Sequence, residues 1–190
     1  MCYIMYTTMT NIEKLKTSLE NLADREHYIF SASDFYLLFP SLSACALNML
    51  LSRAVKKGLI TRASKGFYIY SKANYERGFE LFHLAARLRE DNFSYLSLES
   101  MLSEAGIISQ IPIGYITLMT GGRSGIINCG KYGRVEFIHT KRTFEVLSSQ
   151  LIYDKRYKLW RASVPLAFAD MKAAKRQMDL IDKETLNEFI

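Results

Sequence analysis

Apolar residues at helical spacing predict three helices in the first third of the chain. The first helix covers residues 10–24, where leucines recur after the capping-box sequence Thr10-Asn11-Ile12-Glu13. A short second helix covers residues 34–39 and ends before Pro40, because the residue before a proline avoids the helical region. The third helix covers residues 43–57. A tight turn that begins at Pro40 separates the last two helices.

The third helix has an apolar stripe and an outward face. Leu47, Leu50, Leu51 and Ala54 stand at positions i, i+3, i+4 and i+7, so we expect them to be buried. Gly58 follows as a left-handed C-cap residue. The side chains that point away from the stripe are Cys45, Asn48, Met49, Ser52, Arg53 and Lys56.

A β hairpin is predicted after the third helix. Residues 59–62 and 67–70 are rich in strand-forming side chains and flank a short turn that contains Gly66. Residues 27–30, between the first two helices, are interpreted as a short extended connection. The order helix, helix, tight turn, helix, hairpin is that of a winged helix-turn-helix, in which the third helix fits the major groove of DNA. We therefore predict a winged helix-turn-helix domain over residues 1–72.

The rest of the chain, residues 73–190, mixes helical and strand patterns. The pattern predicts helices over 75–91, 97–105 and 163–180, a short final helix capped by Asp182, and strands over 115–119, 126–128 and 134–139. Ser97 is the expected N-cap of its helix. The segment Gly121–Gly125 is expected to be the turn of a glycine-rich hairpin. The predicted fold class is α+β, with the winged helix followed by a mixed α/β domain that has a small, mainly antiparallel sheet.

Positive charge is concentrated in the predicted DNA-binding domain. Between Ser43 and Lys72 there are six basic residues and no acidic ones, which leaves 19 of the 25 basic residues to balance the 19 acidic ones. An acid-free basic segment favours a polyanion as partner. The alternatives are an ordinary solvated surface, or a winged helix that contacts only proteins. The residues predicted to contact DNA are Ser43, Asn48, Ser52, Arg53, Lys56, Lys57, Arg62 and Lys65.

Five basic residues of the second domain form a second candidate surface. They are Arg123, Lys131, Arg134, Lys141 and Arg142. One interpretation is a basic patch for RNA or an acidic partner, and the favoured one is a solvated face of the sheet. The nearby Gly121–Gly125 segment lacks the spacing of a phosphate-binding loop and is followed by a predicted strand rather than a helix, so we expect no nucleotide site there.

Other chemistry is not indicated. Three histidines, His27, His83 and His139, lie far apart in the sequence, and the carboxylates Asp34, Glu99, Glu136 and Asp170 are likewise isolated, so we expect no metal, no cofactor and no catalytic site. Three scattered cysteines, Cys2, Cys45 and Cys129, fit a reducing cytoplasm. Residues 1–6 are apolar but resemble no secretory signal, and no stretch is long enough to span a bilayer.

Four blocks of sequence resemble the antitoxins of type IV, abortive-infection toxin–antitoxin systems, the AbiEi family. The blocks are 52–60 with 65–68, 95–106 with Ile111-Pro112 and 120–124, 133–142, and 162–170. The last resembles the family's Ala-Ser-Pro-x-x-Ala-x-x-Asp helix start, with the proline one residue later. The resemblance as a whole covers roughly residues 11–180.

This resemblance implies two roles. The first domain would bind repeats in its own promoter and repress the operon, and the second would neutralise a nucleotidyltransferase-like toxin, with direct contact to the toxin left open. Two alternatives remain at this point. One is a winged-helix regulator whose second domain senses a ligand or mediates dimerisation, and the other is an enzyme that uses the Gly121–Gly125 loop and the basic sheet face.

Overall fold

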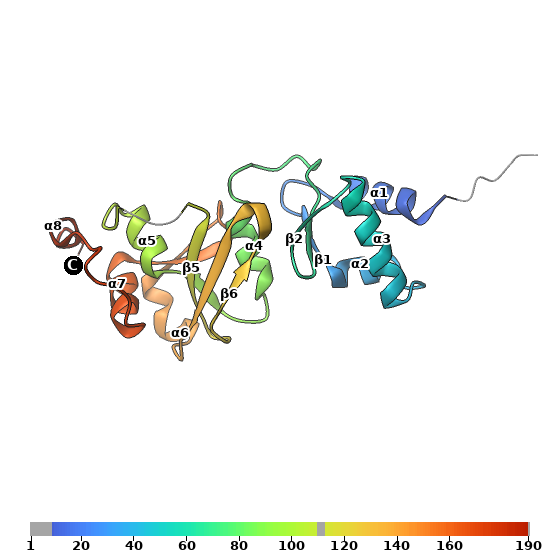
Figure 1. Ribbon diagram of the computed structural model, residues 1–190. Helices are drawn as coiled ribbons and strands as arrows, with labels where there is room; N and C mark the ends of the chain where they lie inside the picture. Colours follow the sequence, from blue (N-terminus) through green and yellow to red (C-terminus); the bar gives the residue numbers. More distant parts are fainter. Residues whose placement is uncertain (1–8, 110–112, 190) are drawn as a thin grey trace, which may run out of the picture. The chain divides into compact units, whose positions relative to one another are not determined.

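The computed structural model describes residues 9–109 and 113–189, and the chain divides into two compact units between Glu76 and Arg77 (Figure 1). Cys2 and the apolar segment 1–6 lie outside the described residues, as does the Ile111-Pro112 pair. None of the helices in the described part of the chain has the length and apolar character needed to cross a membrane.

The N-terminal unit consists of helices around a small antiparallel sheet (Figure 1). The elements in chain order are α1 (Asn11–Leu22), β1 (Ile29–Ser31), α2 (Ala32–Leu38), α3 (Ala44–Lys56), β2 (Thr61–Ser64) and β3 (Phe67–Ile69). The strands are arranged in the order β1-β3-β2, so the β2–β3 hairpin gains a third strand from the segment between the first two helices.

Strand β1 corrects the prediction of a plain extended connection over residues 27–30. Its residues pair with β3 from Ile29 opposite Ile69 to Ser31 opposite Phe67. A three-residue strand carries too little alternation to be recognised without its partner. Ser31 then caps α2, since its hydroxyl accepts a hydrogen bond from the Asp34 amide while the Asp34 carboxylate accepts one from the Ser31 amide.

The core of the N-terminal unit confirms the stripe predicted for the third helix. Leu47, Leu50, Leu51 and Ala54 are all buried, and α3 packs against α1. The expected capping box of α1 is present, and Gly58 adopts the left-handed conformation, with φ of 66°. Aromatic side chains complete the core, as in the stack of Tyr28 on Tyr75, whose ring centroids are 3.6 Å apart.

The C-terminal unit is built on a six-stranded mixed sheet in the order β6-β7-β5-β4-β9-β8. The strands are β4 (Ser94–Leu96), β5 (Tyr115–Thr120), β6 (Gly125–Asn128), β7 (Arg134–His139), β8 (Leu151–Asp154) and β9 (Leu159–Ala162). Strands β5, β6 and β7 correspond to the three predicted strands, whereas β4, β9 and β8, which form the other half of the sheet in spatial order, were not predicted. The sheet is therefore larger than expected, and it contains the parallel pairs β5–β7 and β4–β9.

The Gly121–Gly125 segment is not the turn of a hairpin. It leads from β5 to β6, but these strands are separated in the sheet by β7, which pairs with both. At the start of β7, Gly133 has φ of 121°, and a Cβ atom at this position would overlap the carbonyl oxygen of Gly114. This close approach lets the Arg134 amide donate to that carbonyl at 2.7 Å and begins the parallel pair.

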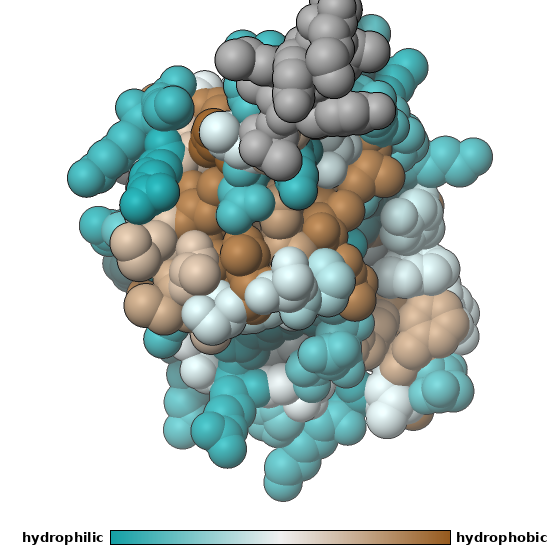
Figure 2. All heavy atoms as spheres, turned by 90° about the vertical axis from the view of Figure 1, so that its right-hand side faces the viewer, coloured by the Kyte–Doolittle hydropathy of each residue, from teal (hydrophilic) through white to brown (hydrophobic). Residues whose placement is uncertain are grey.

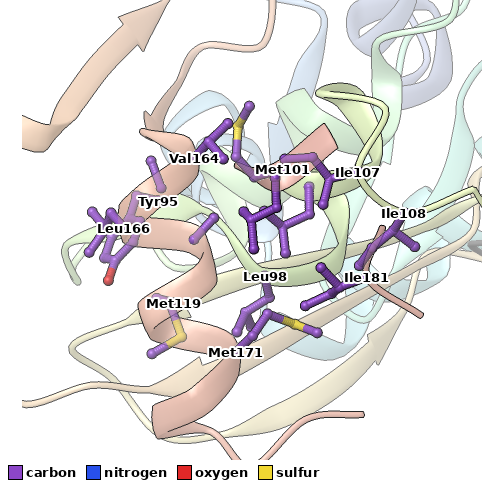
Figure 3. Packing of buried hydrophobic residues seen from close by; sticks show 14 of the residues in the cluster. Tyr95, Leu98, Met101, Ile107, Ile108, Met119, Val164, Leu166, Met171 and Ile181 are labelled. Atoms are coloured by element: carbon purple, nitrogen blue, oxygen red, sulfur yellow. The ribbon is translucent and has the colours of Figure 1, made fainter. Parts of the chain in front are cut away.

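Helices and short helical turns accompany the sheet in the C-terminal unit. They are α4 (Glu80–Leu88), α5 (Leu98–Glu104), η1 (Gly130–Tyr132), α6 (Phe144–Leu147), η2 (Ser148–Gln150), α7 (Val164–Ala173) and α8 (Lys183–Leu186). Helix α5 packs against α7 and β5 around a buried cluster that includes Leu98, Met101 and Met171 (Figure 3). Ile108 and Ile181 close one side of this cluster, where their segments form an isolated antiparallel bridge (Figure 3).

Helix α7 is shorter than the 163–180 helix predicted. Lys175 adopts a left-handed conformation with φ of 52°, and the Arg176 amide donates to the Met171 carbonyl at 2.9 Å, which closes the helix. The expected N-caps are confirmed at both ends of this region, since Ser163 caps α7 and Asp182 caps α8.

Candidate nucleic-acid interface

The outward face of α3 forms a shallow, open hollow. It is lined by the six side chains that the sequence placed opposite the buried stripe: Cys45, Asn48, Met49, Ser52, Arg53 and Lys56. All six are exposed. Ser43 lies at the N-cap, where its hydroxyl accepts a hydrogen bond from the Ala46 amide at 3.3 Å. The geometry leaves a whole helical face available to a partner.

The polar side chains on this face are not engaged elsewhere. Within residues 9–109 and 113–189, Arg53 and Lys56 have no acidic partner, and Asn48 and Ser52 make no side-chain hydrogen bond. Met49 adds an apolar side chain that is 51% exposed. Figure 2 looks onto the molecule from the side of the N-terminal unit and shows apolar surface bordered by hydrophilic side chains.

The tip of the β2–β3 hairpin carries two more cations. Gly66 has φ of 80°, as its tight turn requires, and its carbonyl accepts a hydrogen bond from the Ala32 amide at 2.7 Å. This bond anchors the tip to the start of α2. Lys65 and Arg62 are exposed, and the Arg62 Nε atom donates to the Ser64 carbonyl at 3.3 Å. Lys65 therefore lies on a fixed turn, and Arg62 lies in β2 opposite Tyr68, so neither is on a free loop.

Lys57 belongs to a different surface from the α3 hollow. As the C-cap residue of α3 it lines a second hollow, together with Ile12, Glu13, Lys16, Leu59 and Lys72. Glu13 is held by Thr10, whose backbone amide and hydroxyl donate to the carboxylate and lower its pKa. The sequence argument did not include Lys16, since it is far from the acid-free segment in the chain and only folding of α1 onto α3 brings it close.

The five basic residues predicted for the second domain do not form one patch. Lys131, in η1, and Arg134 lie near the start of β7, whereas Lys141 and Arg142 follow its end. Arg123 also lies near that end, because it precedes β6, whose first residue Gly125 pairs with Phe137 of β7. A six-residue strand separates these two groups by roughly 17 Å. The ammonium group of Lys131 lies 5.1 Å from the ring centroid of Tyr132.

Arg142 is part of a buried polar cluster. The carboxylate of Asp170 is fully buried and accepts hydrogen bonds from Arg142, from the Tyr95 hydroxyl at 3.0 Å and from the Ser97 hydroxyl at 2.6 Å. Burial raises the pKa of Tyr95 to about 12, against the opposite effect of the Arg142 charge, so the hydroxyl remains a donor. Ser97 stands at the N-cap position of α5 as predicted, but its hydroxyl serves Asp170 instead of the helix.

Carboxylates that are isolated in the sequence meet arginines in the fold. Arg176 donates to Glu99 at 2.5 Å and to both carboxylate oxygens of Glu136 at 3.0 Å. This placement follows from the left-handed turn that ends α7. Glu99 and Glu136 are isolated in the sequence, but folding brings both of them to one guanidinium group, a tertiary pairing that the sequence did not indicate.

A second arginine network ties the β8–β9 hairpin together. Asp154 accepts hydrogen bonds from Arg156 at 3.1 Å and Arg161 at 2.9 Å, and Arg161 also contacts Glu104. Burial raises the pKa of Asp154, but the hydrogen bonds from these two arginines outweigh it and lower the pKa to about 2. The network is a structural ion cluster across β8, β9 and α5.

The polar groups of the Gly121–Gly125 loop are turned toward the protein. The Gly121 amide donates to the Phe93 carbonyl at 2.9 Å and the Gly122 amide to the Thr120 hydroxyl at 3.1 Å. His139 Nδ1 donates to the Gly122 carbonyl at 2.8 Å. A phosphate-binding nest needs free amides that point at the ligand, and two of these amides are already used.

No group of three or more potential metal ligands (histidine, cysteine, aspartate or glutamate) is found among the described residues. Comparison with protein family models gives no match for this chain. A search of curated proteins likewise finds none that matches.

Proposed function

We propose that the N-terminal unit is a winged helix-turn-helix that binds double-stranded DNA, with α3 in the major groove and the β2–β3 hairpin against the phosphate backbone. The observation that carries the proposal is the outward face of α3, where Arg53 and Lys56 are exposed and, within the part of the chain that the structure describes, have no acidic partner. Asn48 and Ser52 beside them make no side-chain hydrogen bond within that same part. The sheet order β1-β3-β2 supports it, since β1 pairs with β3 and so holds the hairpin against the helical part of the unit.

The physical fit follows from size and charge. An α-helix with its side chains matches the width of the major groove, and polar side chains on its outward face reach the base edges. Arg62 and Lys65 on the fixed hairpin tip are suited to phosphate contacts, which position the helix without reading sequence. The Ser43 hydroxyl accepts the hydrogen bond that caps α3, so its own O–H group is left to donate to a phosphate.

Gel-shift titrations over a salt series test this proposal. With duplex DNA from the region upstream of the gene, each phosphate contact adds about 0.9 to the slope of log affinity against log salt concentration. Arg62→Ala and Lys65→Ala should each reduce that slope, whereas Lys131→Ala, in the C-terminal unit, should leave it unchanged. If the native protein binds no duplex, or if the slope does not respond to either hairpin substitution, the assignment of the wing is wrong.

We further propose that the chain is a type IV antitoxin that represses its own operon. The support for this wider proposal is the set of residue blocks in the C-terminal unit that resemble the AbiEi family, including 95–106 and 133–142. Co-expression with a neighbouring nucleotidyltransferase-like gene tests it. The full-length chain should relieve growth arrest by that gene product, and the Lys65→Ala variant should do so equally well while repressing the promoter less. Absence of any rescue by the native chain would contradict the antitoxin role and leave DNA binding standing.

A further inference from the structure

The outward face of α3 carries an unusual selection of side chains for a surface helix. It combines one amide, Asn48, one guanidinium, Arg53, and one exposed apolar side chain, Met49, and α3 contains no carboxylate at all. Each of these groups matches a different base edge in the major groove. Asparagine forms paired hydrogen bonds with N6 and N7 of adenine, arginine with O6 and N7 of guanine, and apolar side chains contact the methyl group of thymine.

The missing carboxylate is equally informative. Direct reading of cytosine uses an aspartate or glutamate to accept a hydrogen bond from its N4 amino group. Since α3 has no acidic residue, the strand that faces it contains no cytosine read in this way. The three side chains named above therefore match edges of adenine, guanine and thymine.

The spacing of the two polar readers sets the spacing of their bases. Asn48 and Arg53 are five residues apart, which is a rise of about 7.5 Å along the helix axis. Successive base pairs are about 3.4 Å apart. The two side chains are also about 140° apart around the helix axis, so they stand at opposite edges of the outward face and point toward opposite strands. For a helix that runs along the groove, the bases they reach are therefore about two steps apart and on different strands.

We propose that α3 reads a short DNA element in which an adenine facing Asn48 and a guanine facing Arg53 are about two base pairs apart, with a thymine methyl group against Met49. This inference rests on the proposed DNA binding and specifies its target. Arg53 and Asn48 act as specificity residues, whereas Lys65 on the hairpin tip acts on affinity alone.

Selection from a randomised duplex library with the full-length protein tests the inference. The native protein should enrich the adenine–guanine element, and Asn48→Ala and Arg53→Ala should each relax the preference at one position by roughly 5- to 150-fold. Lys65→Ala should weaken binding to all duplexes without changing the enriched element. Circular dichroism spectra that match the native protein show that each variant is folded.

Base analogues then test each contact directly. Replacing the guanine by 7-deazaguanine removes the N7 acceptor, so it should weaken binding of the native protein but not of the Arg53→Ala variant. Replacing the adenine by 7-deazaadenine should likewise weaken binding of the native protein but not of the Asn48→Ala variant. The inference is overturned if both variants enrich the same element as the native protein. It is also overturned if Arg53→Ala loses affinity for all duplexes equally and has a lower salt slope, because Arg53 would then contact a phosphate and not a base. Salt-dependent binding without any enriched element also overturns it while DNA binding survives, and failure to bind any duplex refutes both.

Discussion

Replacing Arg142 by glutamine should destabilise the C-terminal unit through the buried carboxylate of Asp170. That carboxylate is fully buried and would keep only the two neutral donors, the hydroxyls of Tyr95 and Ser97. Removing one partner of a buried ion pair typically costs about 3–5 kcal/mol. Because the Arg142 side chain is 34% exposed, water screens part of the interaction, and we expect a loss of about 2–4 kcal/mol in the free energy of unfolding.

The single tryptophan makes this loss measurable in one unit of the chain. Trp160 lies in β9 directly opposite Tyr95 in the parallel β4–β9 pair, so urea denaturation followed by its fluorescence reports the C-terminal unit. Arg134→Gln is the matched control: it removes an exposed arginine from the start of β7 and should change stability by less than about 0.5 kcal/mol.

A double-mutant cycle separates the ion pair from lost packing. In an Asp170→Asn background the carboxylate charge is gone, so Arg142→Gln should cost less than about 1 kcal/mol there. The reasoning is refuted if Arg142→Gln is nearly neutral in the native background, or if it costs the same in both backgrounds. Either result would mean that the Asp170 charge does not depend on Arg142.

Three further predictions address the backbone, the ion clusters and the thiols. Gly133→Ala should cost about 3 kcal/mol or more in urea denaturation, because its methyl group would overlap a backbone carbonyl and its φ of 121° and ψ of −149° suit only glycine. Gly106→Ala should cost about 1–2 kcal/mol, since its φ of 74° is in the ordinary left-handed region and the space around it is open. Asp154 has a pKa lowered to about 2 in the folded chain, so its ion cluster stabilises the fold above about pH 4. This contribution of about 2 kcal/mol to the free energy of unfolding disappears as the pH falls toward 2. The Asp154→Asn variant should therefore lose that part of the pH dependence of stability. In a Cys2→Ser background, Cys45 should react rapidly with a thiol reagent at pH 8, and Cys129, fully buried with a pKa raised to about 11 by burial, should react only after unfolding.

Opposite results would contradict each prediction in a specific way. Equal losses for the two glycine substitutions would mean that the β7 start adapts to a side chain. An unchanged acid profile for the Asp154 variant would mean that its arginine partners do not hold the charge in solution. Two fast thiols in the folded protein would place Cys129 at the surface.

Local features of the chain were predictable because they depend on neighbours in sequence. The Thr10–Glu13 capping box, the left-handed Gly58 and the buried stripe of α3 need only residues a few positions apart, and the structure confirms each of them. The same periodicity identified the α3 face that carries the proposed DNA contacts, since the outward positions of a helix are fixed once its buried positions are known.

Short strands and charge pairs escaped the sequence argument for the opposite reason. Strands β1 and β4 have three residues each, too few to show alternation, and they exist because partners far along the chain supply their hydrogen bonds. The cluster around Asp170 joins residues 73 and 75 positions away, and it makes Arg142, predicted as a surface cation, the partly exposed partner of a buried carboxylate.

The sequence by itself determined that the N-terminal unit has three helices, which face of α3 is buried and where positive charge gathers, because these properties are set by local periodicity and composition. It misplaced the start of α2, which is at Ala32 and not at residue 34. Only the tertiary structure decided that β1 joins the hairpin, that Lys57 leaves the α3 face for a hollow beside Lys16, and that the second domain's basic residues separate to opposite ends of β7. Those outcomes depend on which distant segments pair, and pairing is settled by the packing of the whole unit and not by any stretch of residues within it.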